Sequence, residues 1–394
     1  MTERRLRTLE KLGDVAGARV FLRADFNVPL KGGAIADDSR IRATLPTIAE
    51  LRQRGASLVL ASHLGRPKGE ARQELRLAPV GARLGELLET DVTVLPDVTP
   101  GTLPDAPVVL LENLRFDPGE EGNDPAFAGR LADLADAYVD DAFGAAHRAH
   151  ASVNALPELM LASGRAAVAG RLLQEEVDVL GRLLEGPDRP YIAILGGAKV
   201  SDKLGVIDAL LERVDALLVG GAMAFTMLAA RGGQVGASRV EPDLFEQVRR
   251  SLAAAEERGV AIVLPDDVVA ATEVSPGATP IIVPSDAIPA DMMGLDIGPR
   301  TVERFAGVIA EARTILWNGP MGVFEQEPFD AGTRGVALAV AGSLAFSVVG
   351  GGDSLAAVRA AGLEGSFDHL STGGGASLEF LEGRALPGIT ILED

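Results

Sequence analysis

Short apolar runs recur along the chain and alternate with segments of helical periodicity. Most runs are nearly continuous hydrophobics, which is typical of strands buried on both faces of a parallel sheet. The intervening segments, such as 43–54 and 204–214, carry apolar residues at helical spacing. The pattern predicts an α/β protein with two doubly wound, Rossmann-like domains and mainly parallel sheets. The predicted strands are 19–23, 57–61, 92–95, 107–111 and 138–140 in the first series, and 191–195, 216–219, 260–264, 314–317 and 346–349 in the second.

A single amphipathic segment separates the two series. Apolar positions between 170 and 184 repeat at intervals of three and four, and Gly186-Pro187 ends the pattern. A chain of 394 residues also exceeds the size at which one hydrophobic core usually keeps growing. We therefore predict an N-terminal domain over 1–169, a connecting helix over 170–186 and a C-terminal domain over 187–377.

Composition narrows the classes of function. The net charge of −19 argues against a nucleic-acid surface. The absence of cysteine excludes disulfides, thiolate metal sites and cysteine nucleophiles. Charged residues begin at Glu3, and no long apolar run follows them. We therefore expect neither a signal peptide nor a membrane span. The absence of cysteine also fits a cytoplasmic protein.

Basic and polar side chains follow the strands of the first series, where ligands bind in doubly wound sheets. Guanidinium forks at these points suit a small, highly charged anion. Three of the four histidines lie in the same Arg-bearing segments, but none has the local spacing of a zinc site. The alternative is that the arginines are solvated and the histidines structural. The segments are Arg23–Asn27, Ser62–Arg66, Asn113–Arg115 and His147–His150.

Glycine-rich turns follow the strands of the second series instead. Glycine lets backbone N–H groups approach phosphate oxygens, although a single Gly-Gly pair is more often a plain turn. Lys199 and Lys203 are four residues apart, which would place both on one helix face. A shared polyanion would relieve their repulsion; two solvated lysines are the alternative. The turns are Gly196–Lys203, Gly350–Ser354 and Gly373–Ser377.

Two carboxylates in the second half each allow two interpretations. Asp353 precedes a helical segment, so it is either an N-cap or a ligand of Mg²⁺, which prefers oxygen. Glu325 lies in a Gly/Pro loop, where it either accepts from ribose hydroxyls or is simply solvated. No Walker motif occurs, and no G-x-G-x-x-G follows the first strand. The second absence disfavours a dinucleotide dehydrogenase, whereas a non-catalytic binding protein stays open as an alternative.

These motifs, in this order, resemble the phosphoglycerate kinase family from about residue 18 to the C-terminus. Ala24 departs mildly from the family, in which Val is commoner at that place. The motifs are Arg23–Pro29, Ser62–Pro67, Leu111–Phe116, Asp140–Gly144, His147–His150, Gly196–Lys203, Trp317–Pro320, Gly350–Ser354 and Ser371–Ser377.

The resemblance implies an enzyme that reversibly transfers the acyl phosphate of 1,3-bisphosphoglycerate to MgADP, giving ATP and 3-phosphoglycerate in glycolysis. It implies a monomer whose two domains close a cleft, with a C-terminal tail from about 378 to 394 that returns to the N-terminal domain. It further implies that Asp353 binds Mg²⁺ and that Arg40, Lys199, Lys203, Gly373, Gly374 and Gly375 surround the phosphoryl group in transfer.

The resemblance also divides the ligand contacts between the domains. The residues that would bind the phosphoglycerate are Asp25, Asn27, Arg40, His63, Arg66, Arg115 and Arg148. Those that would bind the nucleotide are Gly197, Ala198, Lys203, Gly220, Gly221, Leu295, Asn318, Pro320, Glu325, Gly351, Gly352, Asp353 and Ser354.

Overall fold

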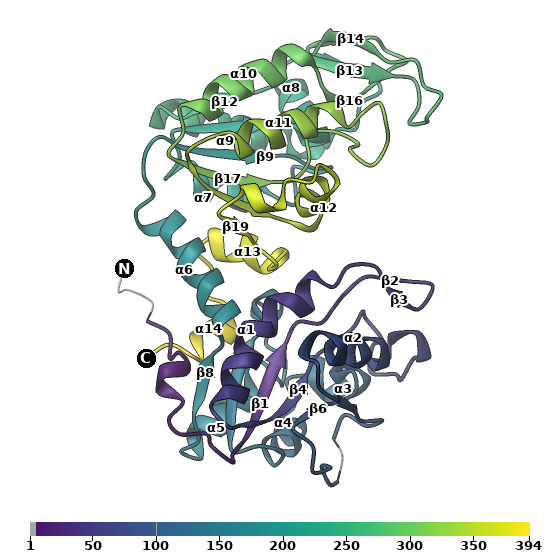
Figure 1. The fold of residues 1–394 in the computed structure, drawn as a ribbon. Coiled ribbons are helices and arrows are strands. Elements are labelled where there is room, and N and C mark those ends of the chain that lie inside the picture. The colour runs from purple at the N-terminus through teal and green to yellow at the C-terminus, as the bar shows by residue number, and fades with distance from the viewer. Residues whose placement is uncertain (1–4, 100) are drawn as a thin grey trace. The chain divides into compact units, whose positions relative to one another are not determined.

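The computed structural model describes residues 5–99 and 101–394, which separate into two compact units. The N-terminal unit runs up to Asp178 and includes Ala385–Asp394, and the C-terminal unit is Val179–Arg384. Figure 1 traces the chain through both units. Helix α6 (Arg171–Glu185) begins in one unit and ends in the other.

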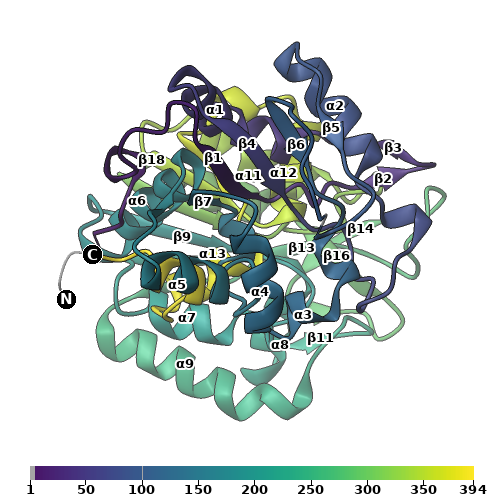
Figure 2. The ribbon, with the colours of Figure 1, turned by 90° about the horizontal axis from the view of Figure 1, so that it is seen from below.

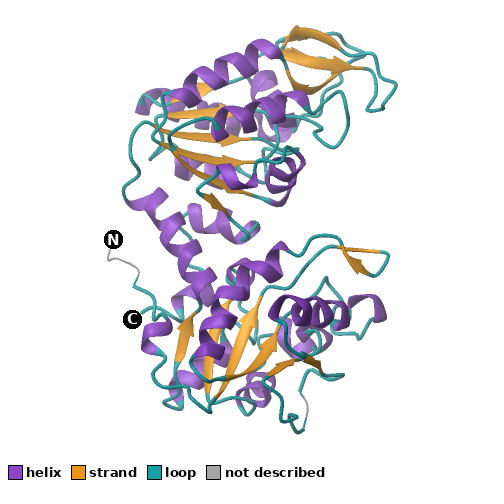
Figure 3. Cartoon of the chain, viewed as in Figure 1, coloured by secondary structure: helices purple, strands orange, loops and turns teal. Residues whose placement is uncertain are grey.

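The N-terminal unit is built on a six-stranded sheet in the order β5-β6-β4-β1-β7-β8. All of its strand pairs are parallel. Helices pack on both faces of the strands, as the colours of Figure 3 show. The strands are β1 (Arg19–Ala24), β4 (Ser57–Ala61), β5 (Thr93–Val94), β6 (Val108–Leu110), β7 (Ala137–Asp141) and β8 (Ala167–Ala169); the helices are α1 (Ser39–Gln53), α2 (Ala78–Leu88), α3 (Pro118–Glu121), α4 (Pro125–Ala132) and α5 (Ala155–Ala162).

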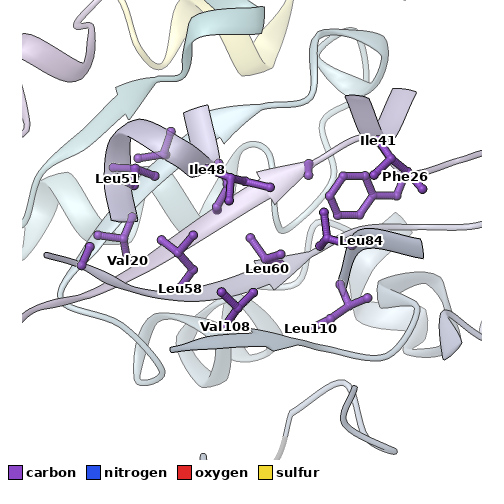
Figure 4. Packing of buried hydrophobic residues seen from close by; sticks show 14 of the residues in the cluster. Val20, Phe26, Ile41, Ile48, Leu51, Leu58, Leu60, Leu84, Val108 and Leu110 are labelled. Carbon is purple, nitrogen blue, oxygen red and sulfur yellow. The ribbon is translucent and has the colours of Figure 1, made fainter. Parts of the chain in front are cut away.

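Alternate strand residues supply the core beneath α1 and α2. Because successive side chains in a strand point to opposite faces, Val20 and Leu22 join this core while Phe21 and Arg23 lie on the other face. There the ring of Phe21 stacks on that of Tyr138 at 5.9 Å between centroids. Figure 4 shows the core side chains from the sheet (Val20, Leu58, Leu60, Val108, Leu110) against those from α1 (Ile41, Ile48, Leu51) and α2 (Leu84).

The first described residues and the last ones both belong to the N-terminal unit (Figure 2). Leu6 forms an antiparallel bridge with Glu393, and Thr8 forms a parallel one with Ala169. The short helix α14 (Pro387–Thr390) is held where the Gly388 N–H donates to the carbonyl of Ala146 at 2.9 Å. The last residues therefore complete a unit that the first residues begin.

The C-terminal unit repeats the architecture on a second parallel six-stranded sheet, β12-β10-β9-β17-β18-β19. Helices α10, α11 and α12 bury their apolar faces against one side of it. Figure 2 shows α7, α8 and α9 on the opposite side of β9 from α11 and α12. The strands are β9 (Tyr191–Leu195), β10 (Ala216–Val219), β12 (Ala261–Val263), β17 (Thr314–Asn318), β18 (Phe346–Gly350) and β19 (His369–Leu370); the helices are α7 (Leu204–Leu210), α8 (Gly221–Ala230), α9 (Phe245–Arg258), α10 (Pro299–Ala310), α11 (Ala331–Ala341), α12 (Gly352–Ala360) and α13 (Gly375–Leu381).

Smaller sheets also occur in both units. In the C-terminal unit, β13 (Asp267–Ala271) pairs antiparallel with both β14 (Ile281–Pro284) and β16 (Met293–Ile297). Two-residue strands form two further pairs: β2 (Leu30–Lys31) with β3 (Ala34–Ile35), and β11 (Gln234–Val235) with β15 (Ala287–Ile288).

The fold confirms the predicted α/β class with two parallel sheets. The sequence interpretation did not include the edge strands β8 and β19. The helix predicted over 204–214 ends at Leu210, and a turn follows it. Among the described residues, no helix combines the length and the apolar character needed to cross a bilayer.

Candidate functional sites of the two units

The candidate anion residues of the N-terminal unit gather at one edge of its sheet. Strands β6, β4, β1 and β7 are neighbours and run parallel, so their carboxyl ends share that edge. Arg40 joins them from the first turn of α1. The strand-end residues are Asp25 and Asn27 after β1, His63 and Arg66 after β4, Arg115 in the 3₁₀ turn Leu114–Phe116 after β6, and Arg148 after the turn Phe143–Ala145 that follows β7.

Asp25 and Arg40 form an ion pair at this edge. Burial of the Asp25 carboxyl favours its neutral form, but the neighbouring guanidinium groups, Arg40 foremost, outweigh burial and hold its pKa below the ordinary value. Gly144 borders the pair, because a β-carbon there would lie 2.5 Å from Asp25 Oδ2 and 3.3 Å from Arg40 Nη1. Asp25 is thus an anionic anchor that keeps Arg40 beside the strand ends.

Hydrogen bonds tie three of the strand-end loops together. The Gly65 N–H donates to Asn27 Oδ1 at 2.9 Å, and Arg115 Nη1 donates to the Gly65 carbonyl at 2.9 Å. Arg115 also faces Glu121 at 3.5 Å. Burial, and then the nearby charge of Arg23, lower the pKa of Arg115. The loops after β1, β4 and β6 therefore form one supported surface.

Two of the predicted residues stand apart from this bonded set. Arg66 and Arg148 are exposed, and among the described residues no hydrogen bond or ion pair of their side chains joins them to the others. Arg148 lies close enough to His150 to contribute to its lowered pKa of about 4, for which burial and Arg115 are the larger causes. Both arginines are therefore free to turn toward a ligand.

The sequence interpretation included Arg23 in a candidate anion-binding segment, but the structure buries it beneath this surface, where Ser152 and Glu120 had been assigned no role. Arg23 is fully buried, and its Nε donates to Ser152 Oγ at 2.8 Å. The Ser152 hydroxyl in turn donates to Glu120 Oε1 at 2.6 Å. The signal available in the sequence was an arginine inside an otherwise apolar strand, which needs a buried partner.

In the C-terminal unit, a cavity of about 400 Å³ opens beside the glycine turns. Its apolar walls include Phe225, Val268 and Met293, which no sequence motif indicated. A concave, largely apolar site of this size suits an aromatic base. The predicted nucleotide residues that line it are Gly197, Ala198, Gly221, Leu295, Pro320, Glu325 and Asp353.

Lys203 lies next to this cavity in a different setting from Lys199. The helix α7 begins only at Leu204, so the prediction that both lysines share one helix face is wrong. Lys199 is exposed in the preceding loop, whereas Lys203 is 8% exposed and donates to Asn318 O at 2.7 Å. Burial lowers the pKa of Lys203 to about 7, although Asp353 and Asp202 oppose the shift.

Asn318 connects Lys203 to the other glycine turns. A β-carbon at Gly350 or Gly351 would lie 3.2 Å from the Asn318 amide nitrogen, so the turn after β18 packs directly on this side chain. The next residue, Gly319, donates its N–H to Ser354 Oγ at 2.6 Å. The ends of β17 and β18 and the start of α12 therefore form one structural group.

Asp353 is not an N-cap, since Gly351 takes that position and Asp353 is the second residue of α12. Its side chain is exposed at the cavity.

The remaining predicted glycines lie outside the cavity. Gly220 donates its N–H to the Leu195 carbonyl at 2.8 Å and does not line the cavity. Gly352 opens α12, and Gly373 and Gly374 precede α13, which begins at Gly375.

Other residues of this unit escaped the sequence interpretation. Arg239 is an exposed basic side chain on the cavity wall, on a loop that Ser238 fixes by accepting from the Gly294 N–H at 2.9 Å. Glu241 accepts from the N–H groups of Val200 at 2.7 Å and Ser201 at 3.1 Å, which holds the loop between Lys199 and Lys203. Across the described residues, no group of three or more His, Cys, Asp or Glu side chains is arranged to hold a metal ion.

Comparison with known proteins identifies the class of this chain as a phosphotransferase. A family model described as phosphoglycerate kinase matches residues 9–384. A phosphoglycerate kinase of Rubrobacter xylanophilus is 55% identical over 400 aligned positions, which cover 100% of this chain and 99% of the relative. One of Salinispora tropica is 56% identical, with 98% of this chain and 99% of the relative covered.

Solved structures agree with the sequence relatives. The structure of phosphoglycerate kinase from Coxiella burnetii has a TM-score of 0.89 and 42% identity, covering 98% of this chain and 99% of that one. The phosphoglycerate kinase from Pyrococcus horikoshii has a TM-score of 0.85 and 32% identity, with 98% of each chain covered. The chain belongs to the phosphoglycerate kinase family, which confirms the resemblance found in its motifs.

Proposed function

We propose that this chain catalyses the reversible transfer of a phosphoryl group between 1,3-bisphosphoglycerate and ADP, yielding 3-phosphoglycerate and ATP. Membership of the family supports the reaction. The observation that carries the assignment of ligands is the contrast between the two units. One unit gathers arginines at its strand ends, and the other has an apolar cavity beside a buried lysine.

The N-terminal unit would bind the phosphoglycerate. Arg66, Arg115 and Arg148 supply guanidinium forks for its phosphate, and His63 supplies one further donor. Asp25 and Asn27 provide acceptors and an amide for the hydroxyl and carboxyl groups. Arg40, held by Asp25, would contact the carboxyl group of the ligand at which the new bond forms.

The C-terminal unit would bind the nucleotide. The base fits between the apolar walls of the cavity, and Glu325 accepts from the ribose. Lys203, fixed by Asn318, and the N–H groups of the turn at Gly351–Ser354 face the polyphosphate. Asp353 is a single exposed carboxylate at the same place, which suits Mg²⁺ because that ion is usually held by one or two carboxylates together with substrate phosphates.

Transfer of the phosphoryl group then requires mainly that the protein position the two substrates and neutralise the negative charge of the transition state. A transferring phosphoryl group passes through a loose, highly anionic transition state. Arg40, Lys199, Lys203 and the N–H groups at Gly373–Gly375 would neutralise that charge, while bound Mg²⁺ would neutralise charge on the nucleotide phosphates. The leaving carboxylate is a weak base, so it needs no general acid. Because Arg40 belongs to one unit and the two lysines to the other, residues of both units must meet in the working complex. Exclusion of water from that complex limits ATP hydrolysis.

We further propose that the chain works as a monomer in the cytoplasm and that a hinge motion brings the ligand sites together. The domains would be 1–169 completed by a tail from about 378, a connecting helix over 170–186, and 187–377. Small-angle scattering with and without both substrates tests the hinge: a lower radius of gyration in the ternary complex is expected, and an unchanged one would contradict it. Sedimentation equilibrium tests the monomer.

A coupled assay tests the reaction itself. Purified chain is supplied with 3-phosphoglycerate, ATP and Mg²⁺, and formation of 1,3-bisphosphoglycerate is followed through a dehydrogenase that consumes it with NADH. Robust turnover that requires all three is the expected result. Absence of turnover in a folded preparation that still binds both substrates would identify a non-catalytic binding protein instead.

A further inference from the structure

A buried contact between Arg23 and His63 constrains the histidine in the candidate phosphoglycerate site. Arg23 stands near the end of β1, and His63 follows β4, its parallel neighbour. Arg23 is 0% exposed and His63 is 5% exposed. Arg23 Nη2 lies 3.2 Å from His63 Nδ1. The contact is therefore between a permanent cation and a ring that can exist in three protonation forms.

The chemistry of the two groups leaves one form that satisfies the contact. A guanidinium carries only N–H donors and no acceptor. His63 Nδ1 must therefore supply a lone pair, which neither an imidazolium nor an Nδ1–H tautomer has. We infer that Arg23 fixes His63 as the neutral Nε2–H tautomer, so that His63 presents a hydrogen-bond donor without charge to the bound phosphoglycerate. The part that concerns the ligand rests on the proposed function.

A chain of buried hydrogen bonds holds Arg23 in the orientation this requires. Its Nε donates to Ser152 Oγ at 2.8 Å, and its Nη1 donates to the Ala24 carbonyl at 2.5 Å. The Ser152 hydroxyl donates onward to Glu120 Oε1 at 2.6 Å, while the Ser152 N–H donates to Glu120 Oε2 at 2.9 Å. Glu120 and Ser152 are both 0% exposed. Each hydrogen bond in this network pairs a donor with an acceptor, so one set of proton positions satisfies all of them.

The surrounding charges favour the same form of the ring. Burial, together with Arg23, Arg115 and Arg40, lowers the pKa of His63 well below its ordinary value, although Asp25 opposes the shift. A neutral donor among arginines adds directional selectivity without further repulsion between cations. Arg23 is thus a positioning residue that acts through His63, and Glu120 and Ser152 position Arg23 in turn.

Nitrogen-15 NMR of the free wild-type protein tests the tautomer directly. The chain has only 4 histidines, so a His63→Gln variant assigns the ring signals of His63 unambiguously. At pH 7 the expected pattern is an unprotonated Nδ1 and a protonated Nε2. A protonated Nδ1, in either the other tautomer or the imidazolium, would overturn the inference.

A matched pair of serine variants tests the positioning. Ser152→Ala removes the hydroxyl that links Arg23 to Glu120, while Ser163→Ala removes an exposed hydroxyl that donates to the Met160 carbonyl in the same unit. Ser152→Ala should give a mixture of His63 tautomers and raise KM for 3-phosphoglycerate roughly tenfold, the effect of losing a hydrogen bond to a charged group, with KM for ATP unchanged. Ser163→Ala should change none of these.

Other outcomes separate this inference from the proposed function. A Ser152→Ala protein with wild-type His63 signals and a wild-type KM for 3-phosphoglycerate would contradict the positioning role. If Ser152→Ala unfolds, Glu120→Gln provides the same test, because its amide weakens the charge that holds Arg23. A wild-type protein with the expected tautomer but no binding of 3-phosphoglycerate by calorimetry would reject the ligand role and the proposed function together.

Discussion

The ammonium group of Lys203 donates two hydrogen bonds to Asn318, one to its main-chain oxygen at 2.7 Å and one to its side-chain oxygen at 2.5 Å. The loop after β9 is thereby joined to the end of β17, its neighbour in the sheet. Both acceptors are neutral oxygens, so they do not cancel the charge of the buried ammonium group. The group can therefore still bind an anionic polyphosphate. Asn318 therefore positions Lys203, the side chain proposed to bind the nucleotide phosphates.

Asn318→Ala should weaken nucleotide use more than phosphoglycerate use. The change removes one of the two acceptors of a buried ammonium group, and a hydrogen bond to a charged group is worth about 1.5–3 kcal/mol. We expect kcat/KM for ADP to fall by about 10- to 100-fold. Initial rates at saturating second substrate measure this, with Asn154→Ala in the N-terminal unit as the control. A variant within twofold of wild type would remove Asn318 from this role.

Lys203→Met should change the pH dependence of stability. The pKa of Lys203 is about 7 in the folded chain against 10.5 as its ordinary value. Between these values the unfolded chain binds the extra proton, so the wild-type free energy of unfolding rises with pH by up to about 1.4 kcal/mol per unit. Below pH 7 the lysine is charged in both states and the cost of burying it is fully present.

The variant lacks this titration, so its stability relative to wild type should be greatest near pH 6 and should decline toward pH 10. Urea unfolding of both proteins at pH 6, 8 and 9.5 measures the difference, in which the other titrating groups cancel. A difference that stays constant across these pH values would mean that Lys203 keeps an ordinary pKa in the folded chain.

Arg40→Ala should lower turnover by roughly 10³-fold or more, as expected for an arginine that neutralises a phosphoryl transition state. Its ion pair with Asp25 offers a second test. Gly144→Ala would place a β-carbon 2.5 Å from Asp25 Oδ2, forcing the pair to shift, so turnover should also fall. Single-turnover kinetics with both variants measure the chemical step. Turnover of Arg40→Ala within about tenfold of wild type would exclude the role.

Arg115→Ala should mainly weaken binding of 3-phosphoglycerate. Arg115 is largely buried and donates to the Gly65 carbonyl, so its guanidinium is already oriented at the strand ends. Calorimetric titration with 3-phosphoglycerate should show an affinity lower by about 10-fold or more, the value of one charge-assisted hydrogen bond. Titration with ADP should give the wild-type affinity. Equal loss for both ligands would indicate a general structural defect.

Arg239→Leu should weaken ADP binding about 3- to 10-fold, since a guanidinium over an aromatic ring contributes about 0.5–1 kcal/mol at an exposed site and more when desolvated. Arg239 lines the cavity, whereas Arg231, an exposed arginine at the end of α8, does not. Arg231→Leu is therefore the matched control. Fluorescence or calorimetric titration with ADP compares the two. Equal effects from both variants would show that net charge, and not the cavity wall, decides the affinity.

Much of the fold could be read from local pattern. The bounds of β4, β9 and β10 are those predicted, because a strand buried on both faces is a nearly continuous apolar run. The antiparallel strands β13, β14 and β16 were not predicted. β14 is largely exposed, so its apolar residues mark no buried face, and its pairing with β13 depends on a turn that periodicity does not encode.

The sequence by itself determined the two series of strands, the motifs at their carboxyl ends and, through the order of those motifs, the family. Local chemistry sufficed for these because period and motif are properties of neighbouring residues. Only the tertiary structure decided that Lys203 is buried while Lys199 is exposed, and that Arg23 reaches Ser152. Burial and hydrogen bonding depend on segments more than a hundred residues apart, such as Lys203 with Asn318, and no local pattern records which of them will meet.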